Sequence, residues 1–312
     1  SRPAGLIAAL LLVCHPMFLR RVGYYWNTYL AMAMFLWLVV AAVSLARSRG
    51  SIVRLALFGA GLGALALVNG SYLLAIGAMI PLAAGAPRDK WVGRSALVVA
   101  AMVLAISPWT VRNIVTFGQF IPLRGGASLE MWLGNQPHST GWMTDDTLEL
   151  HPFRNELERQ RMLSMGEKAY FDLCWHRFVE DYTDSPSAFL KRSLMRGWFL
   201  LMSEPAYPVE YPLMPNIEAG GYYVDQLLLN GGLVLLAGLG LWSARREQRP
   251  QFALPLLAVL SVAPFLLSHV CDRYAMPLRL FMMIYAGLAL AEMLRRIRPR
   301  RRPISPVEAL QP

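Results

Sequence analysis

Residues 107–137, SPWTVRNIVTFGQFIPLRGGASLEMWLGNQP, mark the point where the chain leaves a strongly apolar run and becomes polar. Pro108 and Trp109 close that run, and tryptophan is enriched where a membrane-spanning segment meets the lipid headgroups. The residues that follow interleave aromatic, amide, glycine and charged side chains, a mixture that a lipid-facing helix does not tolerate. We therefore predict that the span ends near residue 111 and that residues 124–137 form a tight loop outside the bilayer.

The composition predicts an all-α polytopic membrane protein. Of the 312 residues, 55% are apolar and only 16% are charged, whereas soluble proteins carry about 25% charged residues. The net charge of +10 is spread over short loops and a basic tail, so it indicates orientation in a membrane and not binding to nucleic acid. Apolar runs recur at about 4–19, 28–46, 55–68, 71–86, 92–111, 226–244, 252–268 and 276–294.

Clusters of basic residues orient the chain, because positive loops stay on the cytoplasmic side. These clusters lie at 47–54, 88–94, 245–249 and 295–302. Residues 55–86 must then cross outward and return as two short limbs that meet at the polar turn VNGSY, 68–72. Such a turn at membrane depth requires surrounding protein or a water-filled cavity, so we expect an indentation on the outer side.

The expected organisation has four parts. Residues 1–111 contain transmembrane helices, including the paired short helices around 68–72, and residues 226–294 contain the C-terminal transmembrane helices. Residues 112–225 form an extracytoplasmic region with amphipathic helices, and residues 295–312 form a basic cytoplasmic tail.

A first group of candidate polar residues lies in residues 107–137. Arg112 and Asn113 follow the membrane interface, where an arginine either reaches outer headgroups or binds a lipid phosphate with its planar fork. Glu130, Trp132 and Asn135 lie in the glycine-rich part of the stretch. Their composition suits the wall of a carbohydrate pocket, and it also suits an ordinary turn.

A second polar group lies in SHVCDRYAMP, residues 268–277, between two apolar segments. His269, Asp272, Arg273 and Tyr274 exceed what a solvated connection needs, although Asp272 and Arg273 can also form a local ion pair.

The sequence assigns no metal site and no nucleotide site. His138, Asp145, Asp146 and His151 share one outer segment, but their spacing matches no recognised ligand pattern. A divalent metal is therefore unsupported, and no Walker, GxSxG, HExxH or Rossmann motif occurs.

Residues 107–137 resemble the stretch after a mid-chain helix in bacterial relatives of protein O-mannosyltransferases, the family 39-like glycosyltransferases with the GT-C fold. Further segments resemble parts of this family in the same order, so the resemblance spans most of residues 5–295. They are GLGALALVNGSYLLAIGAMIPL (61–82), GEKAYFDLCWHRFVEDYTDSPSAFLKRSLMRGWFL (166–200) and HVCDRYAMPLRLFMMIYAGLAL (269–290).

The resemblance implies a GT-C-like helical bundle in the bacterial inner membrane. Such an enzyme moves a sugar from a polyprenyl-phosphate carrier to an acceptor on the outer face. A carboxylate acts as base on the acceptor hydroxyl, and basic groups stabilise the departing phosphate. The family's base lies in a first outer loop that would precede Ser1, so the resemblance implies an N-terminally truncated chain.

The resemblance also implies roles for the candidate residues. The residues expected to contact the donor phosphate are Arg112, Arg273, His269 and Tyr274. The residues expected to line the sugar or acceptor pocket are Asn113, Glu130, Trp132 and Asn135. The expected partners are membrane lipids, the polyprenyl-phosphate sugar and an unidentified acceptor, and no other cofactor is assigned.

Departures from the family pattern leave open whether the chain is a fragment of an active enzyme or a divergent chain with altered donor handling, and two alternatives from other functional classes also stay open. Gly70 stands where relatives often have a basic residue, and Cys271 stands where they often have an acid. A transporter or flippase is one alternative, because short helices that meet at a polar turn also mark transporter sites. The spans nevertheless carry almost no ionisable residues for a pathway. The other alternative is a non-catalytic membrane scaffold.

Overall fold

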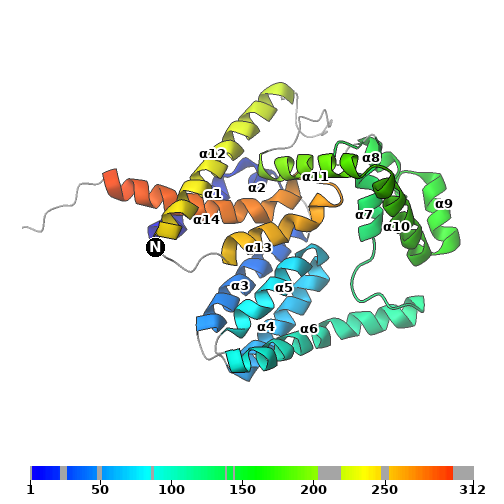
Figure 1. Ribbon diagram of the computed structural model, residues 1–312, viewed down its shortest axis with the longest axis horizontal. Helices are drawn as coiled ribbons and strands as arrows, with labels where there is room; N and C mark the ends of the chain where they lie inside the picture. Colours follow the sequence, from blue (N-terminus) through cyan, green and yellow to red (C-terminus); the bar gives the residue numbers. More distant parts are fainter. Residues whose placement is uncertain are drawn as a thin grey trace, which may run out of the picture.

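The computed structural model consists of α-helices and two short 3₁₀ helices (Figure 1). It describes residues 2–21, 27–47, 51–85, 88–137, 139–142, 145–202, 219–246 and 253–297. Within these ranges there is no named strand, and one isolated bridge joins Trp142 to Val270. The prediction of an all-α chain is confirmed.

The helices fall into three consecutive groups. The first comprises α1 (Arg2–Cys14), α2 (Pro16–Arg21), α3 (Thr28–Arg47), α4 (Ile52–Val68), η1 (Gly70–Tyr72), α5 (Leu73–Ala84) and α6 (Arg88–Phe117). The second comprises α7 (Ala127–Gly134), α8 (Asp145–Glu149), α9 (Glu156–Met165), α10 (Glu167–Asp184) and α11 (Pro186–Leu201). The third comprises α12 (Ala219–Arg246), α13 (Ala253–Val262), η2 (Ala263–Leu266) and α14 (Asp272–Ile297).

Four helices are long and apolar enough to cross a bilayer, which supports a membrane protein. They are Thr28–Arg47, Lys90–Phe117, Leu227–Arg245 and Arg273–Ile297. The shorter apolar helices are Arg2–Cys14, Ile52–Val68, Gly70–Ala84 and Ala253–Leu266. Each predicted apolar segment is therefore helical, and the segment at 4–19 is divided between α1 and α2 at His15.

The turn VNGSY separates two short helices, as the sequence predicted. Asn69 ends α4, and its Oδ1 accepts a hydrogen bond from the Ser71 backbone N at 3.1 Å. Tyr72 is buried at the start of α5, with its ring centroid 4.7 Å from that of Phe35 in α3. The turn is thereby anchored in the packed interior of the helix bundle.

Glycines allow α4 and α6 to lie in backbone contact. A Cβ at Gly59 would overlap the Val98 carbonyl oxygen, and a Cβ at Gly63 would lie 2.7 Å from that of Met102. Because residues four apart share one helix face, this is the close small-residue packing found between membrane helices. Gly240 likewise allows α12 to contact the backbone of α14, because a Cβ at Gly240 would overlap the Tyr285 carbonyl oxygen.

The opening stretch differs from its prediction at two points. Helix α6 continues to Phe117 and not to about 111, so Arg112 and Asn113 lie within its last turns. Pro108 cannot donate to the Leu104 carbonyl, and Ser107 Oγ donates to that oxygen instead, at 2.9 Å. The helix ends before Gly118, whose φ of 66° requires the left-handed region.

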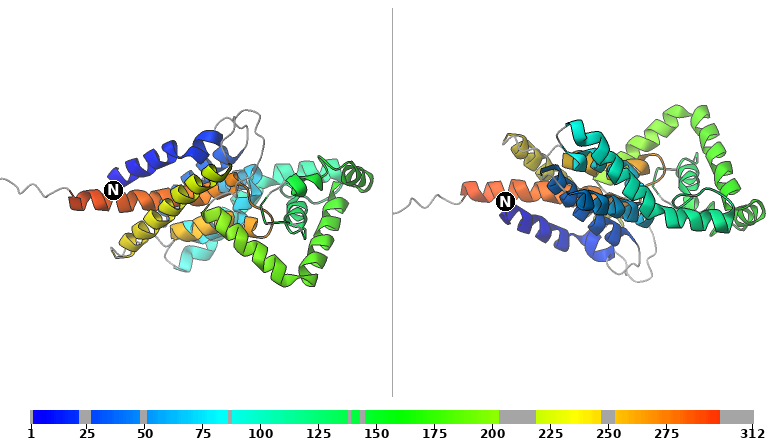
Figure 2. Two further views of the ribbon diagram at one scale, coloured as in Figure 1. Left: turned by 90° about the horizontal axis from the view of Figure 1, so that it is seen from above. Right: turned by 90° about the horizontal axis from the view of Figure 1, so that it is seen from below.

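The predicted tight loop at 124–137 contains a helix, α7. Gly126, with φ of 97°, directs the chain into it, and the following alanine, leucine, glutamate and methionine favour helix. Leu129, Trp132 and Leu133 then pack against Tyr170, Cys174 and Phe178 of α10. Helices α7–α10 gather at one end of the bundle, and α11 runs back from them toward it (Figures 1 and 2).

Candidate functional site

The candidate site lies where α7 meets the segment between η2 and α14. Asn135 fastens the two, because its Nδ2 donates to the Met131 carbonyl at 2.7 Å and to the Leu267 carbonyl at 2.8 Å. A Cβ at Gly134 would overlap the Ser268 carbonyl, so only glycine permits this approach of the two backbones. Segments more than 130 residues apart in sequence are thus locked together.

A second contact holds the other side of the same segment. The Val270 backbone N donates to the Gly141 carbonyl at 3.0 Å, as part of the bridge between Trp142 and Val270. Gly141 has a φ of 86°, and its N donates to Ser139 Oγ at 3.1 Å. Residues 266–271 are therefore bounded by α7 and by residues 139–142.

This arrangement brings Glu130 and His269 together. His269 Nδ1 lies 3.4 Å from Glu130 Oε2, and the imidazole is 1% exposed whereas the Glu130 side chain is 41% exposed. This contact aside, Glu130 Oε2 and both ring nitrogens of His269 are buried without a hydrogen-bond partner among the described residues. These three atoms can therefore still form hydrogen bonds, and the Glu130 side chain is partly open to a ligand.

Burial and nearby charges determine the ionisation of this pair. Burial lowers the pKa of His269 to about 4; the Glu130 backbone opposes this decrease, and the positive charges of Arg273 and Arg196 add to it. The imidazole is therefore neutral at pH 7. Burial raises the pKa of Glu130, while the positive charges of Arg273 and Arg124 oppose that rise. The site combines a neutral imidazole, a carboxyl group and two cations.

Arg273 and Tyr274 lie beside the pair at the start of α14. Arg273 Nη2 donates to Tyr274 Oη at 3.2 Å, with the guanidinium carbon 5.0 Å from the centre of the ring. The Tyr274 ring stacks on Phe265 at 3.9 Å between centroids and lies 5.9 Å from the His269 ring. We refer to Glu130, His269, Arg273 and Tyr274 as the outer polar group, because α7 lies at one end of the helix bundle (Figure 1). The side chain of Asp272 lies outside the described residues.

Arg112 and Asn113 have a different environment. Arg112 Nη1 donates to Asn113 Oδ1 at 3.0 Å, and its guanidinium carbon lies 5.3 Å from the ring centre of Trp109. Asn113 is buried and its Nδ2 donates to the Ile121 carbonyl at 2.8 Å. These two side chains stabilise the turn after α6, and no contact within the described ranges joins them to the outer polar group.

Trp132 and Asn135 lie behind the site. Trp132 is 7% exposed in the cluster between α7 and α10, with the guanidinium carbon of Arg177 4.8 Å from its ring centre. Asn135 is 2% exposed and uses its amide to join α7 to Leu267. In this conformation both side chains support the site from within and offer little surface to a ligand.

The described residues contain no group of three or more His, Cys, Asp or Glu side chains suited to a metal. His138 and the side chains of Asp145 and Asp146 lie outside the described residues. His151 lies near the start of the outer helices, where its Nδ1 accepts a hydrogen bond from the Phe153 backbone N at 3.1 Å.

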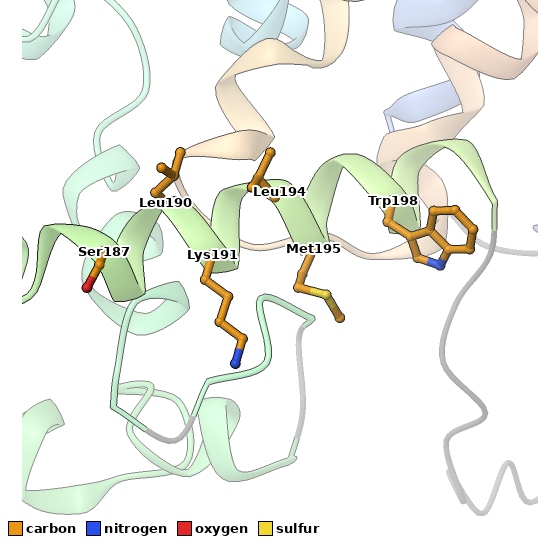
Figure 3. A pocket seen from close by; sticks show the side chains of 6 residues that line it. All are labelled: Ser187, Leu190, Lys191, Leu194, Met195 and Trp198. Carbon is orange, nitrogen blue, oxygen red and sulfur yellow. The ribbon is translucent and has the colours of Figure 1, made fainter.

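Sequence reasoning missed Arg124 and Arg196, which both influence the site. Arg196 belongs to the buried face of α11, together with Phe199 and Leu200. Its position one turn before two apolar residues was the available signal. The opposite, exposed side of α11 forms an open groove (Figure 3). That groove is lined by Ser187, Leu190, Lys191, Leu194, Met195 and Trp198.

Comparison with known proteins identifies no relative. No protein-family model, no curated protein and no solved structure matches this chain. The outer polar group and its place at one end of the helix bundle are therefore the structural basis for a proposal of function.

Proposed function

We propose that this protein is a glycosyltransferase of the bacterial inner membrane that moves a sugar from a polyprenyl-phosphate carrier to an acceptor on the outer face. The observation that carries this proposal is the outer polar group. A cation, a neutral imidazole and a carboxyl group meet at one end of an assembly of apolar helices. The resemblance of the sequence to GT-C enzymes supplies the reaction class.

The proposed role of Arg273 is to bind the carrier phosphate. The leaving phosphate gains negative charge as the bond to the sugar breaks, and a fixed guanidinium stabilises that charge. Arg273 lies in the first turn of α14, where the helix dipole also favours an anion. Stacking over Tyr274 holds the guanidinium in place.

Glu130 and His269 are proposed to line the pocket for the sugar or the acceptor. The carboxyl group of Glu130 is partly open and accepts hydrogen bonds from hydroxyl groups, and Arg124 keeps positive charge close to it. A neutral imidazole both donates and accepts, so His269 orients the Glu130 carboxyl group without adding charge. The base that activates the acceptor is not assigned to a residue of this chain.

The proposal is tested by replacing Arg273 in the full-length protein. Arg273→Ala is expected to lower the initial rate of sugar transfer from lipid-linked donors by about 10²-fold, as for loss of one fixed transition-state donor. Arg273→Lys keeps the charge without the planar fork and is expected to fall between Arg273→Ala and wild type. The rate is measured in membranes with a radiolabelled polyprenyl-phosphate sugar, alongside the amount of folded protein.

Arg159→Ala is the matched control, because Arg159 is exposed and pairs only with Glu156 at the surface of α9 among the contacts described. Its transfer rate is expected to equal that of wild type. An unchanged rate in folded Arg273→Ala would remove the phosphate role of Arg273. A wild-type protein inactive with every lipid-linked sugar tested would refute the proposed function.

A further inference from the structure

Arg196 is a charged side chain with no exposed surface. It projects from α11 into the junction between α7 and η2. Its Nη2 donates to the Gly134 carbonyl at 2.5 Å and to Asn135 Oδ1 at 2.8 Å, and its Nη1 donates to the Leu266 carbonyl at 2.9 Å. One guanidinium thus joins three segments that lie far apart in the sequence.

The acceptors of Arg196 include the ends of two helices. Gly134 is the last residue of α7 and Leu266 is the last residue of η2. Terminal carbonyls lack partners within their own helix and carry partial negative charge, so a cation there is favourable. Burial lowers the pKa of Arg196 to about 9, which leaves it protonated at neutral pH. The charge is offset by backbone dipoles.

The geometry relates Arg196 to Glu130 and His269 without contact to either. Glu130 lies one turn before Gly134 in α7, and His269 follows Leu266 by three residues. The two acceptors of Arg196 therefore fix the helix that carries the carboxyl group and the segment that carries the imidazole. Gly141 closes over the clamp, because a Cβ there would lie 3.0 Å from Arg196 Cγ.

We propose that Arg196 is a positioning residue for the transfer reaction: it clamps α7 to residues 266–269 and so sets the separation of Glu130 and His269. This inference rests on the proposed function. The planar fork is essential, because its donors diverge toward acceptors on two helix ends. A lysine at this position has one nitrogen and cannot reach both ends in the same geometry.

The experiment compares Arg196→Lys and Arg196→Met in the full-length protein. Lys191→Met is the control, because Lys191 also lies on α11 and also carries a positive charge, but its side chain is exposed in the open groove. Melting temperature reports folding, and kcat and KM report transfer. The rate at which diethyl pyrocarbonate modifies His269, followed by mass spectrometry between pH 4 and 8, reports the state of the imidazole without any substrate.

In folded Arg196→Lys and Arg196→Met, we expect kcat to fall about tenfold or more with little change in KM, as for loss of a charge-assisted hydrogen bond. Modification of His269 is expected to become faster. Its pH midpoint is expected to rise in Arg196→Met, where one of the charges facing His269 is removed. Arg273 of α14, Glu130 of α7 and His151 also face His269, and they are unchanged. Lys191→Met is expected to leave kcat and the modification rate at their wild-type values.

Unchanged kcat and unchanged His269 modification in a folded Arg196 variant would overturn the proposal. If Arg196→Met does not fold, Arg196→Lys and Asn135→Ala decide, because Asn135→Ala removes one acceptor of the clamp and its link to Leu267. If wild type transfers no sugar, the modification rate still tests the clamp. Failure of the clamp is thereby distinguished from failure of the proposed function.

Discussion

Buried ionisable side chains meet at the junction of α7 with residues 266–271. Both Nη atoms of Arg196 donate to carbonyl and amide oxygens, whereas both ring nitrogens of His269, like Arg196 Nε, have no hydrogen bond among the described residues. Unsatisfied buried polar atoms are costly, so their presence marks a place where stability is not the only demand. At the scale of single residues, this contrast identifies Glu130 and His269 as the pair to test.

The pH dependence of stability provides one test of this burial. The pKa of His269 is lowered to about 4 in the folded protein, compared with about 6.5 when unfolded. As pH falls from 6.5 toward 4, the unfolded chain takes up a proton that the folded chain does not, so stability decreases. We expect a loss of roughly 3 kcal/mol across this range.

The measurement compares the melting temperatures of wild type and His269→Gln at pH 7.5 and pH 5. Wild type is expected to lose more on acidification than the variant. Glu130 acts in the opposite direction, because its raised pKa favours the folded state at low pH, but it is common to both proteins. An equal loss in both would contradict the assigned burial of His269.

Gly134 provides a second test at this scale. Gly134→Ala places a Cβ against the Ser268 carbonyl, and we expect it to lower the free energy of unfolding by about 1–3 kcal/mol or more. Gly197→Ala in α11 is the control, since its Cβ would make an ordinary contact, 3.9 Å from Leu266 Cδ2. Thermal melting in detergent measures both, and equal melting temperatures would exclude the close approach of α7 to Ser268.

At the scale of elements, the sequence predicted each apolar helix, because continuous apolar runs bounded by polar residues are typical of the helices of a membrane protein. The boundaries were less predictable. Polar residues from Arg112 onward indicated the end of a span, but hydrogen bonding by Ser107 lets α6 continue past Pro108. Gly125 and Gly126 indicated a turn, which is present, but the helix-forming residues after them were overlooked.

Packing between α4 and α6 gives a prediction at this scale. Gly63→Ala places a Cβ 2.7 Å from the Met102 carbonyl and is expected to separate the two helices and lower the melting temperature. Gly77→Ala in α5 is the matched control, because no atom lies within 4 Å of its added Cβ. Glycine loses more backbone entropy on folding than alanine does. Gly77→Ala is therefore expected to be as stable as wild type or more stable, by up to about 1 kcal/mol. A Gly63→Ala protein as stable as Gly77→Ala would disprove the contact.

At the scale of the whole molecule, the site depends on contacts that no local pattern encodes. Glu130 and His269 were both candidates, but their meeting follows from the fit of Gly134 against Ser268. Arg112 and Asn113 had equally suggestive chemistry and bond within their own stretch. Arg196 was overlooked because a basic residue on an amphipathic helix ordinarily indicates an exposed face.

Orientation in the membrane is tested on the whole protein. In a variant with Cys14, Cys174 and Cys271 replaced by serine, we introduce Ser164→Cys or Ser51→Cys, at positions that are exposed. An impermeant maleimide added to spheroplasts is expected to label Ser164→Cys at once and Ser51→Cys only after permeabilisation. The opposite pattern would place the outer polar group on the cytoplasmic side and contradict the proposed orientation.

The bond from Asn135 to Leu267 spans 132 residues of chain. During synthesis from the N-terminus, α7 is complete long before its partner segment exists. At typical elongation rates that interval is on the order of 10 s. Throughout it, the Gly134 and Asn135 end of α7 lacks residues 266–271, and only segments made earlier, such as the one that carries Arg196, can bind it. The site is therefore assembled only when residues 266–271 arrive, and a ribosome that stalls before residue 267 leaves a chain without it.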